Sequence, residues 1–274
     1  MEKINLMING IPGNVAKNIL EHLDPDVFNL VEASLTGPDV KEDFFEFKNK
    51  KIKLLKPDSR DEKIKEILEK FKNIIAIDYT HPTAVNENAK FYVKHKIPFV
   101  MGTTGGNREE LVKAVEKSEI PAVIAPNMAK QIVGFQAMME FAANNFPDLF
   151  KGYSLEIKES HQSGKADTSG TAKAMVTYFK KLGLNFDTEE IKKERNKDIQ
   201  ENEWKIPKEH LEGHAWHKYS LVSDDKSAKF EFIHNINGRD IYSRGTIDAV
   251  LFLNKKIKEN FKGKAFTMID VLKG

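Results

Sequence analysis

Short apolar runs alternate with segments of helical period through roughly the first 125 residues. The apolar runs predict strands at 4–8, 28–33, 52–55, 74–78, 99–101 and 122–124. Amphipathic stretches between them predict helices at 15–23, 63–71, 84–95 and 108–118. This alternation is typical of a doubly wound parallel sheet, which binds ligands at the carboxyl ends of its strands.

The pattern changes near residue 130. A helix is predicted at 132–145, followed by an alternating strand at 153–159 and a helix at 171–182. Two further alternating segments, 219–222 and 229–234, flank Asp224-Asp225, which predicts a hairpin turn. A last helix is predicted at 246–260, and we expect its apolar face to pack against the first domain.

We therefore predict an α/β protein of two domains. A Rossmann-like doubly wound parallel sheet occupies 1–129 plus 240–274, and an inserted α+β domain with a mostly antiparallel sheet occupies 130–239.

Composition narrows the function classes. The 274 residues include no cysteine, which excludes disulfides, thiolate metal sites and cysteine nucleophiles. The formal net charge is only +2, so neither a nucleic acid nor another polyanion is an expected partner. No apolar run approaches the roughly 20 residues that cross a bilayer. Without a signal pattern before Ile4, we expect a cytoplasmic protein with no membrane partner.

A glycine-containing turn follows the first predicted strand. It reads Gly10, Ile11, Pro12, Gly13, Asn14, Val15 and Ala16, a Gly-x-x-Gly-x-x-Ala pattern between strand and helix. Glycine permits positive φ and lets backbone N–H groups approach a pyrophosphate at the helix N-terminus. A plain tight turn is the alternative, because the spacing departs from Gly-x-Gly-x-x-Gly.

The ends of three later predicted strands also lie on the ligand edge. The strand predicted at 28–33 is followed by Thr36, and no carboxylate lies at its tip, which favours NADPH and leaves NADH possible. Thr80 follows the strand at 74–78. Gly102, Thr103 and Thr104 follow the strand at 99–101 and offer hydroxyls and bare backbone.

A polar loop carries the strongest chemical pattern. His161 can hand over a proton near neutral pH, and Lys165 adds a positive charge. Ser169 is a good N-cap residue, and the N–H groups of Gly170 and Thr171 would face an anion at the helix start. The loop predicts an anion pocket beside a proton donor, although such a His and Lys are often only solvated.

The chain resembles the dihydrodipicolinate reductase (4-hydroxy-tetrahydrodipicolinate reductase) family, specifically its plant-type branch, along nearly its whole length. The resemblance rests on Lys-Glu-Ser-His-Gln-Ser-Gly-Lys-Ala-Asp-Thr-Ser-Gly-Thr-Ala at 158–172, together with 102–106, 125–131, His214-Ala215-Trp216-His217, 234–239, 245–250 and 268–272.

The resemblance implies NAD(P)H-dependent reduction of a small cyclic dicarboxylate in lysine and diaminopimelate biosynthesis. It implies that His161 is the general acid, that Lys165 anchors a carboxylate, and that Gln162, Ser169, Gly170 and Thr171 bind substrate. Residues 10–15, Thr36, Thr80, 102–104 and Arg239 would hold the cofactor with Ala125, Pro126, Asn127 and Met128. The family's inserted sheet mediates tetramers, so a homo-oligomer, tetramer or dimer, is expected.

Two departures from many bacterial members stand out. Gln162 replaces a second histidine and cannot carry charge, and Asn14 replaces a basic residue, which weakens the case for a 2′-phosphate. A nicotinamide-binding sensor without turnover and a reductase of another dicarboxylate are the alternatives. His210, His214 and His217 do not predict a metal site, because 214 and 217 would face opposite sides of a strand.

Overall fold

The computed structural model describes residues 2–274, which divide into two compact units. Unit 1 comprises the residues up to 133 together with 240–274, and unit 2 comprises 134–239. The sequence-based boundaries at 129/130 and 239/240 lie within four residues of this division.

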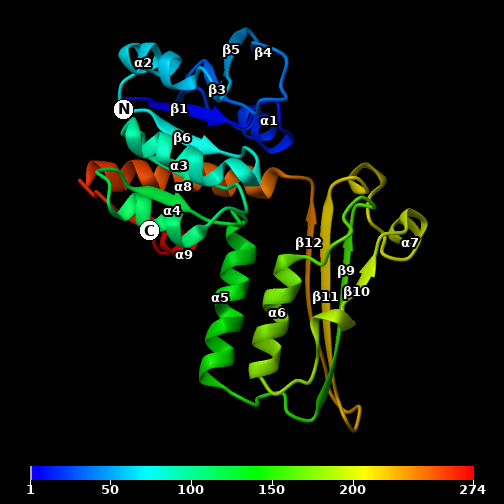
Figure 1. Ribbon diagram of the computed structural model, residues 1–274. Helices are drawn as coiled ribbons and strands as arrows, with labels where there is room; N and C mark the ends of the chain where they lie inside the picture. The colour runs from blue at the N-terminus through cyan, green and yellow to red at the C-terminus, as the bar shows by residue number, and fades with distance from the viewer. Residues whose placement is uncertain (1) are drawn as a thin grey trace. The chain divides into compact units, whose positions relative to one another are not determined.

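Unit 1 is built on a sheet of six parallel strands in the order β13-β8-β7-β6-β1-β2 (Figure 1). The strands are β1 (Ile4–Asn9), β2 (Phe28–Leu30), β6 (Ile75–Asp78), β7 (Phe99–Met101), β8 (Ala122–Ile124) and β13 (Ala265–Phe266). The predicted Rossmann-like parallel sheet is therefore confirmed.

Two details of the predicted sheet were wrong. The expected single strand at 28–33 breaks at Glu32 into β2 and β3 (Ala33–Leu35), and β3 joins a separate sheet in the order β3-β5-β4. That sheet also takes the strand expected at 52–55, as part of β5 (Lys50–Leu55), paired with β4 (Phe44–Phe47). A short apolar run shows that a segment is buried and extended, but it does not show which partner it pairs with.

Helices cover both faces of the six-stranded sheet. They are α1 (Asn14–Glu21), α2 (Arg60–Lys70), α3 (Val85–Lys94), α4 (Arg108–Glu116), α8 (Asp240–Lys258) and α9 (Met268–Lys273), with a short 3₁₀ turn η1 (Pro82–Ala84). Alternate strand residues feed two cores: Leu6 and Ile8 belong to one, and Met7 belongs to the other. This alternation is why the strands are apolar throughout.

Unit 2 holds a four-stranded sheet in the order β10-β9-β11-β12, with helices against one face (Figure 1). Its elements are β9 (Tyr153–His161), α6 (Gly170–Lys181), η2 (Thr188–Glu190), β10 (Lys192–Glu194), α7 (Lys197–Asn202), η3 (Lys208–His210), β11 (His214–Ser223) and β12 (Lys229–Asn237), with α5 (Lys130–Asn145) leading in. The β9–β11 and β11–β12 pairs are antiparallel and β10–β9 is parallel, so the predicted mostly antiparallel sheet is confirmed.

The helix-covered face of this sheet changes character along its length. Toward one end, Ile157, Tyr219 and Leu221 pack with Met175 and Phe179 of α6 in an apolar core. Because side chains alternate along a strand, Glu159 and His161 continue the same face of β9 beyond Ile157. The apolar core therefore passes directly into a group of ionisable side chains.

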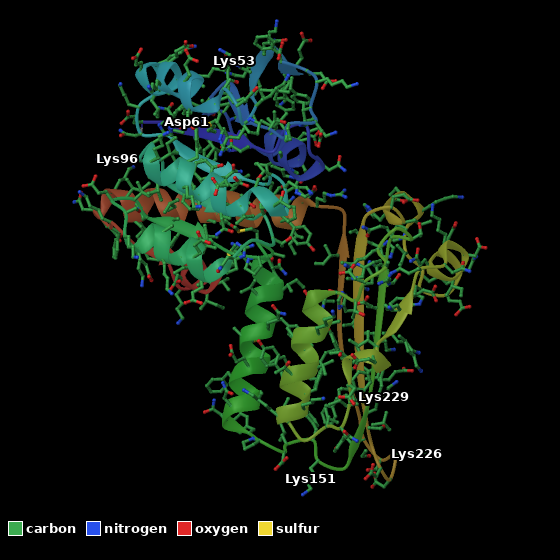
Figure 2. All side chains as sticks on the ribbon, viewed as in Figure 1. Lys53, Asp61, Lys96, Lys151, Lys226 and Lys229 are labelled. Carbon is green, nitrogen blue, oxygen red and sulfur yellow. The ribbon has the colours of Figure 1, made fainter. Side chains whose placement is uncertain are left out.

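Charged side chains elsewhere are dispersed over both units. Figure 2 labels Lys53, Asp61 and Lys96 on unit 1, and each has an ion-pair partner there: Glu66, Lys94 and Glu119 respectively. Among residues 2–274, no helix combines the length and apolar character of a membrane span.

Candidate active site

The turn after β1 requires glycine. Gly10 has φ of +100°, and a Cβ there would lie 2.2 Å from the carbonyl oxygen of Tyr79. Its N–H donates to Leu35 O at 2.9 Å, which fixes the turn against the end of β3. The close approach of these two backbones, together with the positive φ, explains why residue 10 is glycine.

The rest of the turn is anchored on one side and open on the other. Ile11 is buried, and its carbonyl oxygen accepts a 2.9 Å hydrogen bond from the Thr36 hydroxyl. Pro12, Gly13 and Asn14 are exposed, and Val15 is half-buried. Gly13 is the N-cap of α1 and offers no side-chain cap, so the first N–H groups of the helix stay open to an anion.

A buried carboxylate that the sequence analysis did not single out joins the cofactor loops. Asp78 ends β6 and is fully buried. Its side chain accepts from the hydroxyl of Thr80 at 2.8 Å and that of Thr103 at 2.6 Å, and its carbonyl oxygen accepts from the Gly102 N–H at 3.0 Å. On the other side it accepts from Tyr92 Oη at 2.7 Å. Two predicted cofactor loops are thus hydrogen-bonded to the same buried residue, Asp78.

Tyr79 also links these loops. A Cβ on Gly102 would lie 2.3 Å from the Tyr79 ring, whose hydroxyl contacts Thr246 at 2.7 Å. Burial raises the pKa of Tyr79, so it stays neutral. Asp78 and Tyr79 directly precede Thr80, in the segment that the sequence predicted to lie on the ligand edge. Their buried hydrogen bonds mark them as site residues, and sequence alone does not show such bonds.

The remaining predicted cofactor residues are distributed as follows. Thr104 is exposed, and Ala125 is buried with its N–H on Met101 O at 3.1 Å. Pro126 is exposed, Asn127 is half-buried, and Met128 is buried with its carbonyl oxygen against Gly245 of α8. Arg239 is the last residue of unit 2, with its guanidinium beside Gly213.

In unit 2, His161 is the last residue of β9 and is buried, with 7% of its surface exposed. The expectation that it lies in a polar loop was wrong. The alternation that makes Ile157 part of the core extends to His161, so the strand continues two residues beyond its predicted end. The polar loop begins at Gln162, which is half-buried.

The neighbouring Glu159 was missed as a site residue. It is fully buried and forms an ion pair of 2.6 Å with Arg195, which follows β10. Its second oxygen accepts the Ser169 N–H at 3.0 Å, just before α6. A charged residue on an inward-facing strand position was the available signal, since buried carboxylates are almost always paired.

This ion pair positions the loop that carries the other predicted residues. Arg195 Nε donates to the carbonyl oxygen of Lys165 at 2.7 Å, and the Lys165 ammonium lies 2.8 Å from Asp167. Ser169 is the N-cap of α6, and its hydroxyl accepts from Thr171 N–H at 3.2 Å. Of the two N–H groups predicted to face an anion, that of Thr171 is therefore already used.

Gly170 is exposed, with open space where a Cβ would lie. Among the predicted catalytic and substrate-binding residues, the structure brings His161, the backbone of Lys165 and Ser169 together around the Glu159–Arg195 pair.

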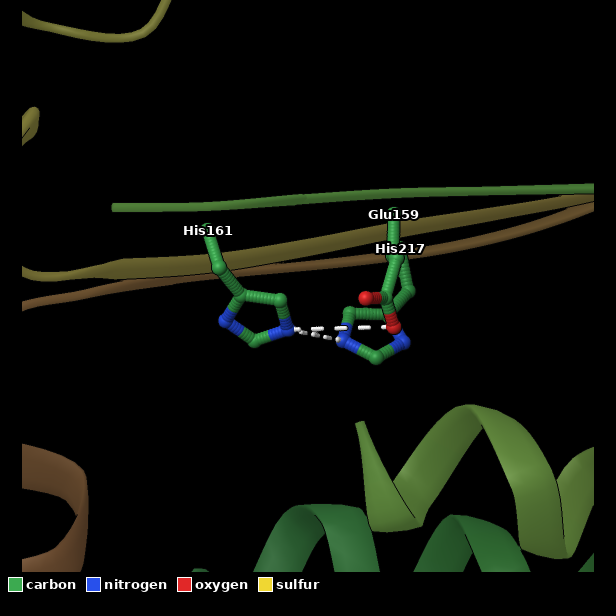
Figure 3. A group of neighbouring side chains, drawn as sticks. All are labelled: Glu159, His161 and His217. Carbon is green, nitrogen blue, oxygen red and sulfur yellow. Dashed lines mark hydrogen bonds and ion pairs between the residues drawn. The ribbon is translucent and has the colours of Figure 1, made fainter. Parts of the chain in front are cut away.

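His161 belongs to a cluster of histidines (Figure 3). His161 Nε2 lies 3.2 Å from His217 Nε2 and 4.0 Å from a carboxylate oxygen of Glu159. Register places His217 opposite Glu159 on β9 and opposite His234 on β12, whose ring stacks on His217 at 4.5 Å. His214 lies on the other face of β11 and contacts the Ser160 hydroxyl at 2.8 Å, as strand alternation predicts.

Burial and the nearby positive charges of Arg195 and Lys165 lower the pKa of His161 to about 4. Burial likewise lowers the pKa of His234 to about 4 and holds that of His217 well below its usual range. The expectation that His161 titrates near neutrality in the free protein was wrong, because sequence alone does not show that the imidazole is buried or that Arg195 lies beside it.

Glu159, His161 and His217 could in principle share a cation, since one ligand atom of each lies within 4.8 Å of the others. Glu159 is already paired with Arg195, and the positive charges of Arg195 and Lys165 repel another cation. The same positive field suits a dianionic substrate, so we read the cluster as an anion and proton site.

Comparison with known proteins adds family-level evidence. Residues 4–128 match the family model described as dihydrodipicolinate reductase, N-terminus, and residues 132–272 match the one for its C-terminus. The chain is 45% identical to 4-hydroxy-tetrahydrodipicolinate reductase 2, chloroplastic, of Arabidopsis thaliana, over 98% of this chain and 77% of that protein.

More distant proteins agree. A 4-hydroxy-tetrahydrodipicolinate reductase of Methanosphaera stadtmanae is 30% identical over 76% of each chain. The solved dipicolinate-bound dihydrodipicolinate reductase from Paenisporosarcina sp. TG-14 shares the fold with a TM-score of 0.67 at 18% identity, covering 97% of this chain and 98% of that one.

Proposed function

This chain belongs to the dihydrodipicolinate reductase family, and we propose that it reduces 4-hydroxy-tetrahydrodipicolinate to tetrahydrodipicolinate with NAD(P)H, in lysine and diaminopimelate biosynthesis. The nicotinamide, when bound, supplies the hydride. The loops of unit 1 fit such a cofactor, because α1 begins without a side-chain cap and its first N–H groups are open to a phosphate, while Gly10 and Gly102 let Tyr79 pack closely against the loops.

One observation carries the proposal for unit 2: His161, the backbone of Lys165 and the N-terminus of α6 are held around the buried Glu159–Arg195 pair. The Lys165 ammonium group, paired with the exposed Asp167, is near enough to lower the pKa of His161. We assign His161 as the proton donor, and Lys165 as the anchor of a substrate carboxylate. The ammonium charge, with the N–H of Gly170, stabilises that carboxylate. A bound dianion would offset the charges of Lys165 and Arg195 and so raise the pKa of His161, which prepares it to donate.

We propose NADPH as the preferred cofactor. In support, residues 33–37 at the end of β3 include no carboxylate that would repel a 2′-phosphate, and Glu32 is ion-paired to Lys50 at 3.1 Å. Steady-state kinetics with NADPH and NADH test this directly. A higher kcat/KM for NADH would reverse the assignment.

The activity itself is tested by following absorbance at 340 nm with freshly prepared substrate and either cofactor. We expect oxidation that depends on substrate. Purified, folded protein that oxidises neither cofactor would refute the proposal and favour a nicotinamide-binding sensor.

We also propose assembly as a homo-oligomer, a tetramer or dimer, through the sheet of unit 2. The edge strand β12 exposes Phe230 and Ile233, which supports this. Light scattering with Ile233→Lys as the variant tests it, and a monomeric wild type would contradict it. A cytoplasmic location stays a prediction.

A further inference from the structure

The two ring nitrogens of His161 have different surroundings. Nε2 lies 3.2 Å from His217 Nε2 and 4.0 Å from a carboxylate oxygen of Glu159. Nδ1 points away from both of these side chains, as Figure 3 shows. Nε2 is therefore directed into the protein, and Nδ1 is the nitrogen left to meet a substrate.

His217 is held from behind by a second hydrogen bond and by stacking. Its Nδ1 lies 3.1 Å from the Tyr219 hydroxyl, which in turn lies 3.3 Å from His234 Nε2. The ring of His234 stacks on that of His217 at 4.5 Å, and His217 is only 1% exposed. All of these side chains belong to unit 2. The His217 ring has little freedom to turn, so its Nε2 stays directed at His161.

The contact between the two Nε2 atoms holds one hydrogen, which can belong to either ring. A neutral imidazole has one N–H and one bare nitrogen, whereas an imidazolium has two N–H groups. When His161 is the charged acid, its Nε2 carries a hydrogen, so His217 Nε2 must be the acceptor. His217 then carries its own hydrogen on Nδ1 and donates it to the Tyr219 oxygen.

Two observations favour this polarity over the reverse one. The Glu159 carboxylate, 4.0 Å from His161 Nε2, attracts a hydrogen at that nitrogen rather than a lone pair. Burial holds the pKa of His217 well below its usual range, so this ring stays neutral and keeps a lone pair to offer. Nδ1 of His234 has no hydrogen-bond partner within residues 2–274 in either polarity, so it favours neither. In the reverse polarity, His161 could become charged only by losing its contact with His217.

We propose that His217 is a positioning residue that accepts the Nε2–H of His161, so that Nδ1 is the nitrogen that gives its proton to substrate. This proposal rests on the proposed function of His161. The Nδ1–H bond breaks as the bond between that hydrogen and the substrate forms, and its electron pair stays on Nδ1. The imidazolium becomes a neutral imidazole whose Nε2–H still donates to His217. Solvent then returns a proton to Nδ1, and no hydrogen bond behind the ring has to invert.

The acceptor on His217 also affects the charge state of the acid. Burial and nearby cations lower the pKa of His161, whereas an acceptor on Nε2 stabilises the imidazolium. Removing that acceptor should lower the pKa of the acid in the complex, so turnover should decline from a lower pH than in wild type. The charged and titratable groups that face the two rings are Glu159 on β9, Lys165 in the loop, Arg195 after β10, His214 on β11 and His234 on β12.

Nitrogen-15 NMR of the histidine rings tests the polarity in the wild-type protein without any turnover. Above neutral pH, where both rings are uncharged, we expect His217 to carry its hydrogen on Nδ1 and His161 to carry its hydrogen on Nε2. The Nδ1–H form is the less populated one for a free histidine side chain, so its presence on His217 would be informative. A hydrogen on Nε2 of His217 would overturn the proposal, whether or not the enzyme is active.

Kinetics test whether the acceptor matters for the reaction. His217→Leu removes it, and we expect kcat to fall roughly 10- to 100-fold, the scale of one hydrogen bond to a charged group, with a modest change in KM. His217→Gln can direct its amide oxygen at His161 and should recover most of the turnover. His214→Leu is the matched control, because it deletes a buried histidine of the same strand whose ring contacts Ser160 on the other face. It should keep near wild-type kcat.

Equal losses of kcat in His217→Leu and His214→Leu, or no recovery in His217→Gln, would show that His217 matters only for packing and would overturn the proposal. If His217→Leu does not fold, Tyr219→Phe gives a second test, since it removes the acceptor of His217 Nδ1–H and keeps the ring that packs on Phe179. His217 should then lose its preference for the Nδ1–H form, and an unchanged preference would overturn the proposal.

Failure of the proposed function would look different. A folded wild type without turnover would refute the role of His161, and with it the catalytic consequence of the His217 contact. The NMR result reports the polarity of that contact separately, so the two failures are distinguishable.

Discussion

Each unit contains one fully buried carboxylate at the centre of its candidate site, Asp78 in unit 1 and Glu159 in unit 2. The two have different partners. Asp78 accepts from the hydroxyls of Thr80, Thr103 and Tyr92 and from amide groups, all of them neutral. Glu159 faces the guanidinium of Arg195 and one backbone N–H.

The difference follows what each site has to do. Neutral donors fix the shape of the unit 1 loops and leave ligand binding to backbone N–H groups and glycine geometry. In unit 2, burial and the charges of Arg195 and Lys165 lower the pKa of His161, and in the proposed function the same charges attract a dicarboxylate. Unit 1 therefore depends on shape, whereas unit 2 depends on charge.

The largest expected effect concerns the ionisable site. His161→Gln keeps the side-chain volume and a hydrogen bond to His217 but cannot donate an acidic proton. We expect kcat to fall by roughly 10²–10⁴-fold with a modest change in KM, measured by steady-state NADPH oxidation. His95→Gln, at the end of α3 in unit 1, is the control. Near wild-type turnover in His161→Gln would show that another group supplies the proton.

The next effect separates a buried charge from an exposed one. Glu159→Gln leaves Arg195 without its anionic partner, so we expect the free energy of unfolding to drop by about 3 kcal/mol in urea titrations. Glu156→Gln on the same strand is the matched control, because its pairs with Lys158 and Lys192 are exposed. That change should cost less than about 1 kcal/mol. Equal losses of unfolding free energy in the two variants would mean that the buried Glu159–Arg195 pair stabilises the fold no more than the exposed pairs of Glu156 do.

How far the sequence could predict these sites differs between the units. In unit 1, the strand ends and the Gly10–Gly13 turn were predictable, because a glycine between strand and helix has a local signature. The break at Glu32 and the second sheet of β3, β4 and β5 were not, because pairing is decided by distant residues. Asp78 was unrecognised, since only tertiary contacts show its five donors.

In unit 2, His161, Lys165 and Ser169 could be proposed from one continuous segment and from resemblance. Arg195 could not, because it lies 36 residues beyond Glu159 and reaches it only through the parallel pairing of β10 with β9. For the same reason the pKa of His161 was misjudged. Its burial and the charge of Arg195 both depend on tertiary structure.

A third test addresses the shape-dependent unit. Gly10→Ala introduces a Cβ 2.2 Å from Tyr79 O at a φ of +100°, so we expect a loss of about 2 kcal/mol in stability and weaker NADPH binding. Gly37→Ala, where a Cβ has open space, is the control and should be nearly neutral. Calorimetry and cofactor titration measure both. If Gly10→Ala bound cofactor normally, the turn would not be the pyrophosphate site.

The smallest expected effect, measured over a single pH unit, is a dependence of stability on pH that belongs to the buried histidines of unit 2. The unfolded His161 has a pKa of 6.5 and the folded one about 4, so between these values the unfolded chain binds more protons. Stability should therefore fall as pH drops from 6.5 toward 4, by about 1 kcal/mol for this group between pH 5.5 and 4.5. His161→Gln should flatten this part of the curve, as should His234→Gln. Glu231→Gln should change the slope of the curve only below pH 4.5, because the pKa of Glu231 is lowered to about 2 and its stabilising contribution, present above 4.5, is lost between 4.5 and 2. A wild-type curve that is level from pH 6.5 to 4 would show that these histidines are more solvated than the fold of unit 2 implies, and it would remove the contrast between a charge-dependent and a shape-dependent site.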